Sequence, residues 1–100
     1  MKRLVKASVS TSIKFIEQPD FFDKFFNTYK PENYFEVYDD KLDFYKYYKL
    51  IDDLYDFIQI QTRSKMKDVE EAIEVIGINL KEKLVDYVYE NEEKLIELLK

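Results

Sequence analysis

Apolar residues recur at helical spacing along much of the chain, and this pattern predicts a mainly helical protein. In segment 19–30 the phenylalanines fall at positions 21, 22, 25 and 26, which form a one-sided helical stripe after Pro19. From residue 42 to about residue 61, a helical wheel at 100° per residue gathers a broad apolar face. That face holds Phe44, Tyr47, Tyr48, Ile51, Leu54, Tyr55 and Ile58. We predict two amphipathic helices that bury these side chains in a core.

The C-terminal third has the signals of further helices. Asp68 begins a capping-box pattern, and Gly77 is placed to end the helix that follows. Asn79 and Asn91 are candidate caps for later helices. One long bent helix or two to three short ones would fit, and we favour a break near Gly77. The inward stripes are Val69, Ala72, Ile73 and Ile76, then Leu80, Leu84, Tyr87 and Val88.

Two segments favour strands. Segment 2–17 alternates in part and is rich in β-branched residues, and segment 33–38 alternates before an Asp39-Asp40 turn. A single glycine argues against many tight hairpins, because turns with positive φ become costly. We predict one compact domain over residues 1–100, with four to five helices and one or two short N-terminal strands. The class is mainly α, or α+β if 2–17 and 33–38 pair.

The composition removes most catalytic chemistry. Without histidine or cysteine there is no Ser-His-Asp or Cys-His arrangement, no thiolate and no zinc site of the usual kind. One glycine leaves no phosphate-cradling loop. Carboxylates four apart, such as Asp52 and Asp56, can hold a hard cation or act as an acid–base pair. Such pairs arise by chance among 21 acidic residues, so we predict a solvated face, no enzyme activity, no metal and no cofactor.

The net charge of −5 is spread in segments of alternating sign. A nucleic-acid-binding protein needs a dominant basic patch, and the candidates are limited to the start of the chain and the cluster 63–67. Direct nucleic-acid binding is therefore disfavoured. The basic start lacks the apolar run of a signal peptide, and no window reaches a membrane-spanning length. We expect a soluble, cytoplasmic protein that binds no membrane.

An acidic surface rich in tyrosine is the first candidate site. Carboxylates on a rigid aromatic-bearing surface can present negative charge to a protein groove that normally holds nucleic-acid phosphates. Tyrosine would supply burial at the contact, while the carboxylates would speed the encounter and set specificity. The residues predicted to contact a partner are Tyr34, Tyr38, Asp39, Asp40, Tyr45, Asp52, Asp53 and Asp56. An ordinary acidic surface is the alternative.

The second candidate site is an apolar face in the C-terminal helices. Segment 80–99 has apolar residues on more than one side, and the second side holds Val85, Tyr89 and Ile96. One interpretation is a structural or assembly module that forms a homodimer through this face. The alternative is extra burial within a monomer.

In overall character the chain resembles the small acidic proteins of phages and mobile elements that block host defence, anti-CRISPR proteins and DNA mimics among them. The features behind the resemblance are the length, the missing catalytic residues and the segment YDDKLDFYKYYKLIDDLYDF (38–57). It implies a non-enzymatic inhibitor that acts in the cytoplasm of a bacterial host. Its partner would be a basic protein that handles nucleic acid.

Overall fold

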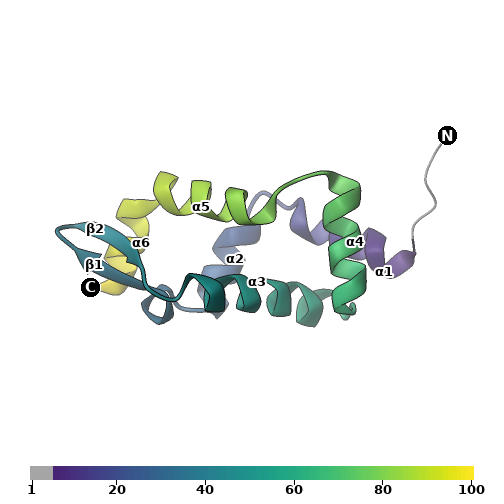
Figure 1. Cartoon of the computed structure of the whole chain (residues 1–100), viewed down its shortest axis with the longest axis horizontal. Coiled ribbons are helices and arrows are strands. Elements are labelled where there is room, and N and C mark those ends of the chain that lie inside the picture. The colour runs from purple at the N-terminus through teal and green to yellow at the C-terminus, as the bar shows by residue number, and fades with distance from the viewer. Residues whose placement is uncertain (1–5) are drawn as a thin grey trace.

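Helices dominate residues 6–100, the part of the chain that the computed structural model describes (Figure 1). The prediction of a mainly α fold with short strands is confirmed. The elements are α1 (Ala7–Ile16), α2 (Phe21–Thr28), the 3-10 turn η1 (Pro31–Asn33), β1 (Phe35–Tyr38), β2 (Lys41–Phe44), α3 (Tyr47–Thr62), α4 (Met66–Ile76), α5 (Leu80–Glu90) and α6 (Glu92–Leu99).

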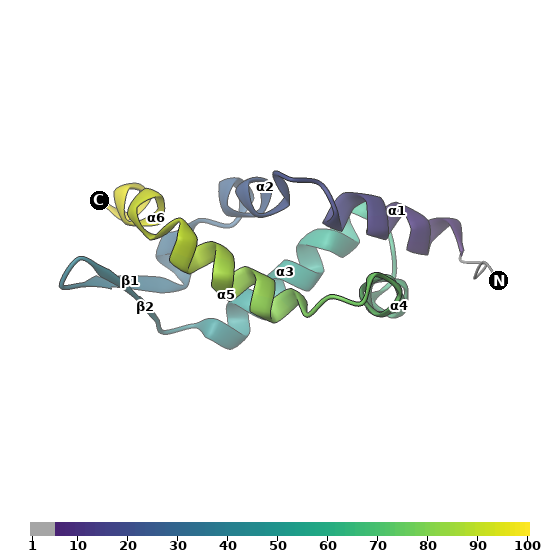
Figure 2. The same cartoon turned by 90° about the horizontal axis from the view of Figure 1, so that it is seen from above.

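The elements form an elongated body that measures 51 × 23 × 20 Å. In Figure 1, α3 and α5 run along the long axis, α4 crosses at one end, and the β1–β2 hairpin projects at the other end beside α6. Figure 2 shows α1, α2 and α6 along one side of the molecule, with α5 and the hairpin on the other. The hairpin and α6 therefore define one tip of the long axis.

Aromatic rings fill the centre of the core. Phe25 of α2 is fully buried, and its ring centroid lies 5.0 Å from Phe26, 5.1 Å from Tyr29 and 5.5 Å from Phe57 of α3. Leu54, Ile58, Val69, Leu84, Val88 and Leu95 complete the core from the remaining helices. The predicted phenylalanine stripe of α2 is confirmed, because residues 21, 25 and 26 are buried.

The N-terminal segment is helical where the sequence favoured strands. Within the predicted strand region 2–17, residues 7–16 form α1, and residues 2–5 lie outside the described part of the chain. Ser12 Oγ lies 3.1 Å from Ser64 Oγ, and both hydroxyls reach the carbonyl oxygen of Ser8, at 3.1 and 3.2 Å. Hydroxyl groups on the inward side of α1 thus find partners at the α3–α4 connection. This buried contact satisfies the hydrogen-bonding groups of the two serine side chains.

The strand predicted at 33–38 is confirmed as β1, but its partner lies immediately downstream. β1 and β2 pair antiparallel in the register Phe35↔Phe44 to Tyr38↔Lys41, so the loop has two residues. Asp39 and Asp40 adopt φ values of 49° and 62°. Positive φ at both loop positions defines a type I′ turn, which aspartate tolerates better than most residues. The hairpin thus forms without glycine.

The helix predicted from residue 42 begins five residues later, at Tyr47. Phe44 therefore belongs to β2, although its ring still packs 4.9 Å from that of Phe35. The backbone N–H of Tyr45 donates to the carbonyl oxygen of Tyr34 at 3.1 Å, which ties this connection to the core instead of to a helical turn. Tyr48, predicted to be core, is 84% exposed. The wheel was wrong here because the buried stripe of α3 is centred on Leu50, Leu54 and Phe57, and Tyr48 lies outside it.

Most of the predicted helix ends are confirmed. Gly77 follows α4 with φ +76°, and Asn79 Oδ1 accepts a hydrogen bond from the Glu82 N–H at 3.2 Å, as a helix cap does. The C-terminal helix breaks a second time at Asn91. The predicted cap at Asp68 is wrong: α4 begins at Met66, and the carboxylate of Asp68 lies 3.9 Å from Lys6 Nζ.

Two left-handed helix ends give a matched test of backbone strain. Gly77 (φ +76°) has open space where a Cβ would lie, whereas Arg63 adopts φ +53° after α3. Gly77→Ala should lower the free energy of unfolding by about 1 kcal/mol, and Arg63→Gly should raise it by up to about 1 kcal/mol. Urea unfolding measures both changes. If both variants changed the free energy of unfolding in the same direction, this explanation by backbone strain would be wrong.

Candidate functional site

The acidic residues predicted on α3 are partly engaged within the fold. Asp52 and Asp56 are exposed, but Asp53 Oδ2 accepts hydrogen bonds from the Tyr34 hydroxyl at 2.6 Å and from Lys49 Nζ at 3.1 Å. Tyr34 is fully buried, so its predicted place on a contact surface is wrong. Burial, and then the hydrogen bond to Asp53, raise the pKa of the Tyr34 hydroxyl above its usual range. This pair is a structural link between η1 and α3.

Tyr45 lies outside the α3 face on which it was predicted. Tyr45 precedes α3 in the sequence, and its hydroxyl donates to the carbonyl oxygen of Glu32 at 2.7 Å. The ring remains 43% exposed, with Lys46 Nζ 5.6 Å from its centroid. Tyr45 therefore holds the η1 segment in place and offers a partner one side of its ring.

The predicted contact residues at the hairpin tip are exposed. Tyr38 is 71% exposed, and Asp39 and Asp40 are exposed at the type I′ turn. The turn lies at the tip of the long axis, whereas the exposed Asp52 and Asp56 lie on the helix that leads away from it (Figure 1). The structure thus divides the predicted acidic surface into two separate groups.

The hairpin has acidic neighbours from α6 that the sequence analysis missed. The backbone N–H of Leu42 donates to Glu92 Oε1 at 3.0 Å, which attaches β2 to the start of α6. A shallow hollow between the hairpin turn and the C-terminal segment is lined by Asp40, Glu93 and Glu97, together with Lys94, Ile96 and Lys100. About fifty residues separate the two segments in sequence. The acidic run ENEE at 90–93 was the available signal, and nothing local linked it to the hairpin.

This end of the molecule carries most of the net negative charge of the described residues. Segments 35–44 and 90–100 together have eight carboxylates and three lysines, a net of −5. The other residues between 6 and 100 include 13 acidic and 11 basic side chains, a net of −2. We name the surface formed by these two segments the acidic tip. Charge that alternates by segment in the sequence is thus concentrated by the fold.

One lysine of the acidic tip is engaged elsewhere. Lys94 Nζ lies 2.9 Å from Asp23 Oδ1 of α2, and the Tyr87 hydroxyl donates to the same oxygen at 2.5 Å. The hydrogen bonds from Tyr87 and then Lys94 lower the pKa of Asp23, while burial and the bond to Asp23 raise the pKa of Tyr87 above its usual range. This network fixes α6 against α2 and α5. It also directs the Lys94 charge toward Asp23.

The residues predicted as a dimer face do not share one exposed surface. Tyr89 is 62% exposed, Val85 is half-buried, and Ile96 is 7% exposed. The break at Asn91 turns α6 relative to α5, so spacing along a single continuous helix no longer applies. Ile96 is therefore wrong as a contact residue, because it is part of the interior.

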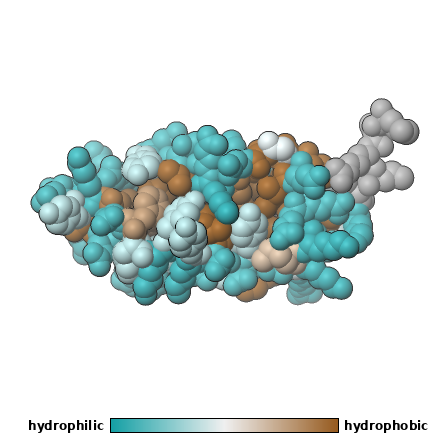
Figure 3. Space-filling view, viewed as in Figure 1, coloured by the Kyte–Doolittle hydropathy of each residue, from teal (hydrophilic) through white to brown (hydrophobic). Residues whose placement is uncertain are grey.

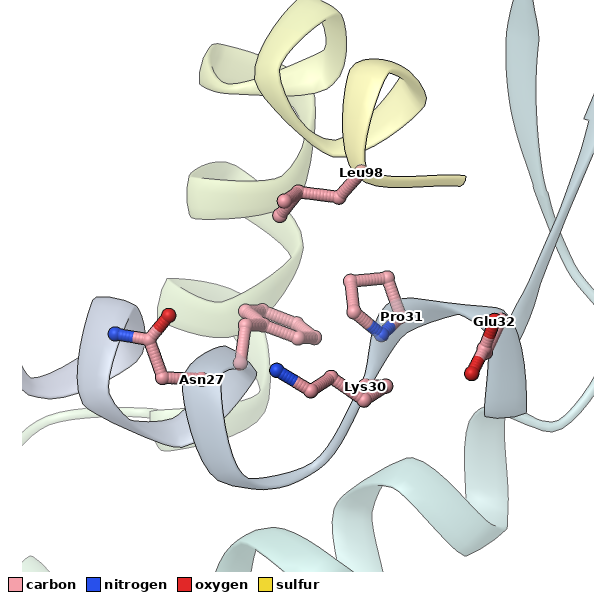
Figure 4. A pocket seen from close by; sticks show the side chains of 6 residues that line it. Asn27, Lys30, Pro31, Glu32 and Leu98 are labelled. Carbon is pink, nitrogen blue, oxygen red and sulfur yellow. The ribbon is translucent and has the colours of Figure 1, made fainter. Parts of the chain in front are cut away.

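A small cleft opens between α2, η1 and α6. Its volume is about 250 Å³, and Figure 4 shows the labelled Pro31 and Leu98 facing each other across it. The remaining lining residues are Phe26, Asn27, Lys30 and Glu32. The apolar floor and the few polar groups at the rim give no set of nucleophile, base and orienting group. The cleft thus carries no evident catalytic chemistry.

Comparisons of the chain with protein-family models, curated proteins and solved structures found no match.

Two absences hold for residues 6–100. In this part of the chain, no group of three or more acidic side chains is placed to hold a metal ion. None of the helices described there combines the length and apolar character needed to cross a bilayer. The acidic tip, with its exposed Tyr38 and the neighbouring exposed Tyr89, is the surface whose chemistry is most distinctive.

Proposed function

We propose that this protein is a non-enzymatic, phage- or mobile-element-encoded inhibitor that acts by binding another protein. Its partner is a basic, nucleic-acid-handling protein of bacterial host defence, and the acidic tip docks onto that partner's nucleic-acid groove. The concentration of a net charge of −5 in the hairpin and α6 segments carries this proposal. The resemblance to anti-CRISPR proteins and DNA mimics adds the class of partner.

Negative charge and exposed aromatic rings occur close together at the hairpin end of the molecule. Carboxylates from two segments lie on the hairpin and α6, which the Leu42–Glu92 hydrogen bond joins, and the Asp23–Lys94 ion pair fixes α6 to α2. A preorganised charged surface loses little freedom on binding and raises the rate of encounter with a basic groove. Tyr38 and Tyr89, at 71% and 62% exposure, can be buried on docking. The carboxylates and the exposed tyrosines together would allow this surface to compete with a nucleic-acid phosphate backbone for the partner's groove.

The test uses guide-RNA-loaded CRISPR nucleases, with binding to a DNA target measured in the presence of the protein. We expect inhibition of DNA binding that weakens by at least about tenfold as salt rises from 50 to 300 mM, because exposed charges are screened. The variant Asp39→Asn/Asp40→Asn/Glu93→Gln should weaken inhibition at low salt. Capture from a host lysate at the same two salt concentrations extends the search to other defence proteins.

A control variant removes the same number of charges elsewhere. Asp56→Asn/Glu70→Gln/Glu74→Gln removes three exposed charges from α3 and α4, away from the tip, and should leave inhibition largely intact. Greater loss from this variant than from the tip variant would move the contact to the side formed by α3 and α4. Failure to inhibit any nuclease, together with failure to capture a basic partner, would contradict the proposed function.

A further inference from the structure

Four aromatic rings form a continuous row beside the acidic tip. The ring centroids of Tyr89 and Phe44 lie 6.3 Å apart, those of Phe44 and Tyr47 5.8 Å, and those of Tyr47 and Tyr48 5.7 Å. These spacings are typical of aromatic pairs in contact. We name Phe44, Tyr47, Tyr48 and Tyr89 the aromatic strip. It joins residues of three elements, β2, α3 and α5, whose ribbons are labelled in Figure 1.

The strip is anchored at its middle and open at its ends. Phe44 packs at 4.9 Å against the buried Phe35, which fixes the row to the core. Tyr48 and Tyr89, at the two ends, are 84% and 62% exposed. In Figure 3, the hairpin half of this face shows apolar and weakly polar residues among hydrophilic ones. Core packing therefore accounts for Phe44 but leaves the two terminal tyrosines unexplained.

The charges around the strip favour a cationic occupant. Asp52 lies one helical turn after Tyr48 and Asp86 lies one turn before Tyr89, and both are exposed. The nearby lysines are directed to other rings: Lys46 Nζ lies 5.6 Å from the Tyr45 centroid and Lys49 Nζ 5.0 Å from that of Tyr34. Ring faces flanked by carboxylates attract a cation that can also stack.

We propose that the aromatic strip binds arginine side chains of the basic partner, an inference that rests on the proposed function. The guanidinium group is planar and weakly hydrated, so it stacks on an aromatic ring while donating to a neighbouring carboxylate. The lysine ammonium is a compact, strongly hydrated charge and gains less from the same surface. The acidic tip would then attract any basic surface, and the strip would select arginine.

The test compares two synthetic peptides of equal length and charge, nine arginines and nine lysines, in titrations at 150 mM salt. We expect the arginine peptide to bind at least about fivefold more tightly, as one or two stacked contacts would give. Tyr48→Ser/Tyr89→Ser should reduce this preference to less than about twofold. Tyr38→Ser removes an exposed tyrosine outside the strip and should preserve the preference. Circular dichroism confirms that each variant is folded.

The outcomes separate the inference from the proposed function. If both peptides bind equally, with a salt dependence that the tip variant weakens, the acidic tip works by charge alone and the strip proposal is wrong. If neither peptide binds, the proposal is also wrong, whereas nuclease inhibition decides the function independently. If Tyr48→Ser/Tyr89→Ser changes self-association of the protein instead of the arginine preference, the strip is a contact between two copies and the proposal fails.

Discussion

Replacing Phe25 with alanine is expected to lower the free energy of unfolding by about 3–5 kcal/mol, the largest effect of any single substitution considered for this chain. Phe25 is fully buried and its ring contacts those of Phe26, Tyr29, Tyr34 and Phe57. Its removal would leave a cavity that these rings, fixed on α2, η1 and α3, cannot fill. For a domain with a total stability of about 5–15 kcal/mol, such a loss is severe.

Phe22 provides the matched control on the same helix. Its ring is half-buried at the edge of the core, 5.2 Å from Tyr87, so Phe22→Ala should cost clearly less than Phe25→Ala. Phe25→Leu should fall between the two because it retains most of the apolar volume. Urea unfolding at neutral pH measures all three. Similar costs for Phe22→Ala and Phe25→Ala would contradict a core centred on Phe25.

The second large effect is a loss of stability in alkali. Tyr34 and Tyr87 are held as neutral phenols by burial and by hydrogen bonds to Asp53 and Asp23, so their pKa values in the folded protein lie above the unfolded value of about 10. Below pH 10 both states are protonated and the stabilisation is complete. As pH rises above 10, the unfolded chain releases two protons that the folded chain retains. These two groups should lower the free energy of unfolding by about 2 kcal/mol between pH 10 and 11, with a limiting slope of about 2.7 kcal/mol per pH unit at higher pH.

Phenylalanine variants isolate this alkaline effect. Tyr34→Phe/Tyr87→Phe should be less stable at pH 7, because two hydrogen bonds are lost, yet its stability should fall less steeply between pH 10 and 11. Tyr48→Phe changes a tyrosine that is 84% exposed and serves as the control for a general loss of hydroxyl groups. Urea midpoints across this pH range give the slopes. Parallel slopes for the wild type and the double variant would show that other groups cause the alkaline loss.

Helical periodicity predicted much of this fold because the apolar stripes of α2, α4 and α5 face one core. The stripe at residues 21–26, the stop at Gly77 and the Asn79 cap depend on local chemistry, and all three are confirmed. The start of α3 depends on the hairpin: the Tyr45 N–H bonded to the Tyr34 carbonyl oxygen continues the β1–β2 pairing past Phe44 and delays the helix, which helical periodicity alone does not predict. The α1 helix likewise depends on Ser64, more than fifty residues away from the serines that it contacts.

The candidate site also combines features that local sequence predicts with features that depend on contacts between segments. The exposure of Tyr38, Asp39 and Asp40 follows from their place in a turn, which sequence chemistry indicates. The burial of Tyr34 follows from its contacts with Phe25 of α2 and Asp53 of α3. The approach of α6 to the hairpin likewise depends on a contact between distant segments, Leu42 and Glu92. Charge totals by sequence segment therefore missed the acidic tip, because the carboxylates gather only in three dimensions.

At the type I′ turn, the residues that would best fit the backbone conformation differ from the aspartates that supply surface charge. An Asn-Gly pair would adopt the two positive φ angles with less strain, so the hairpin would gain stability from replacing both aspartates. The same change would remove two carboxylates from the acidic tip. Selection for thermal robustness alone would favour Asn-Gly, whereas selection for partner binding would retain the aspartates. The most strained residues of the hairpin are thus where a trade-off between stability and activity is most directly visible.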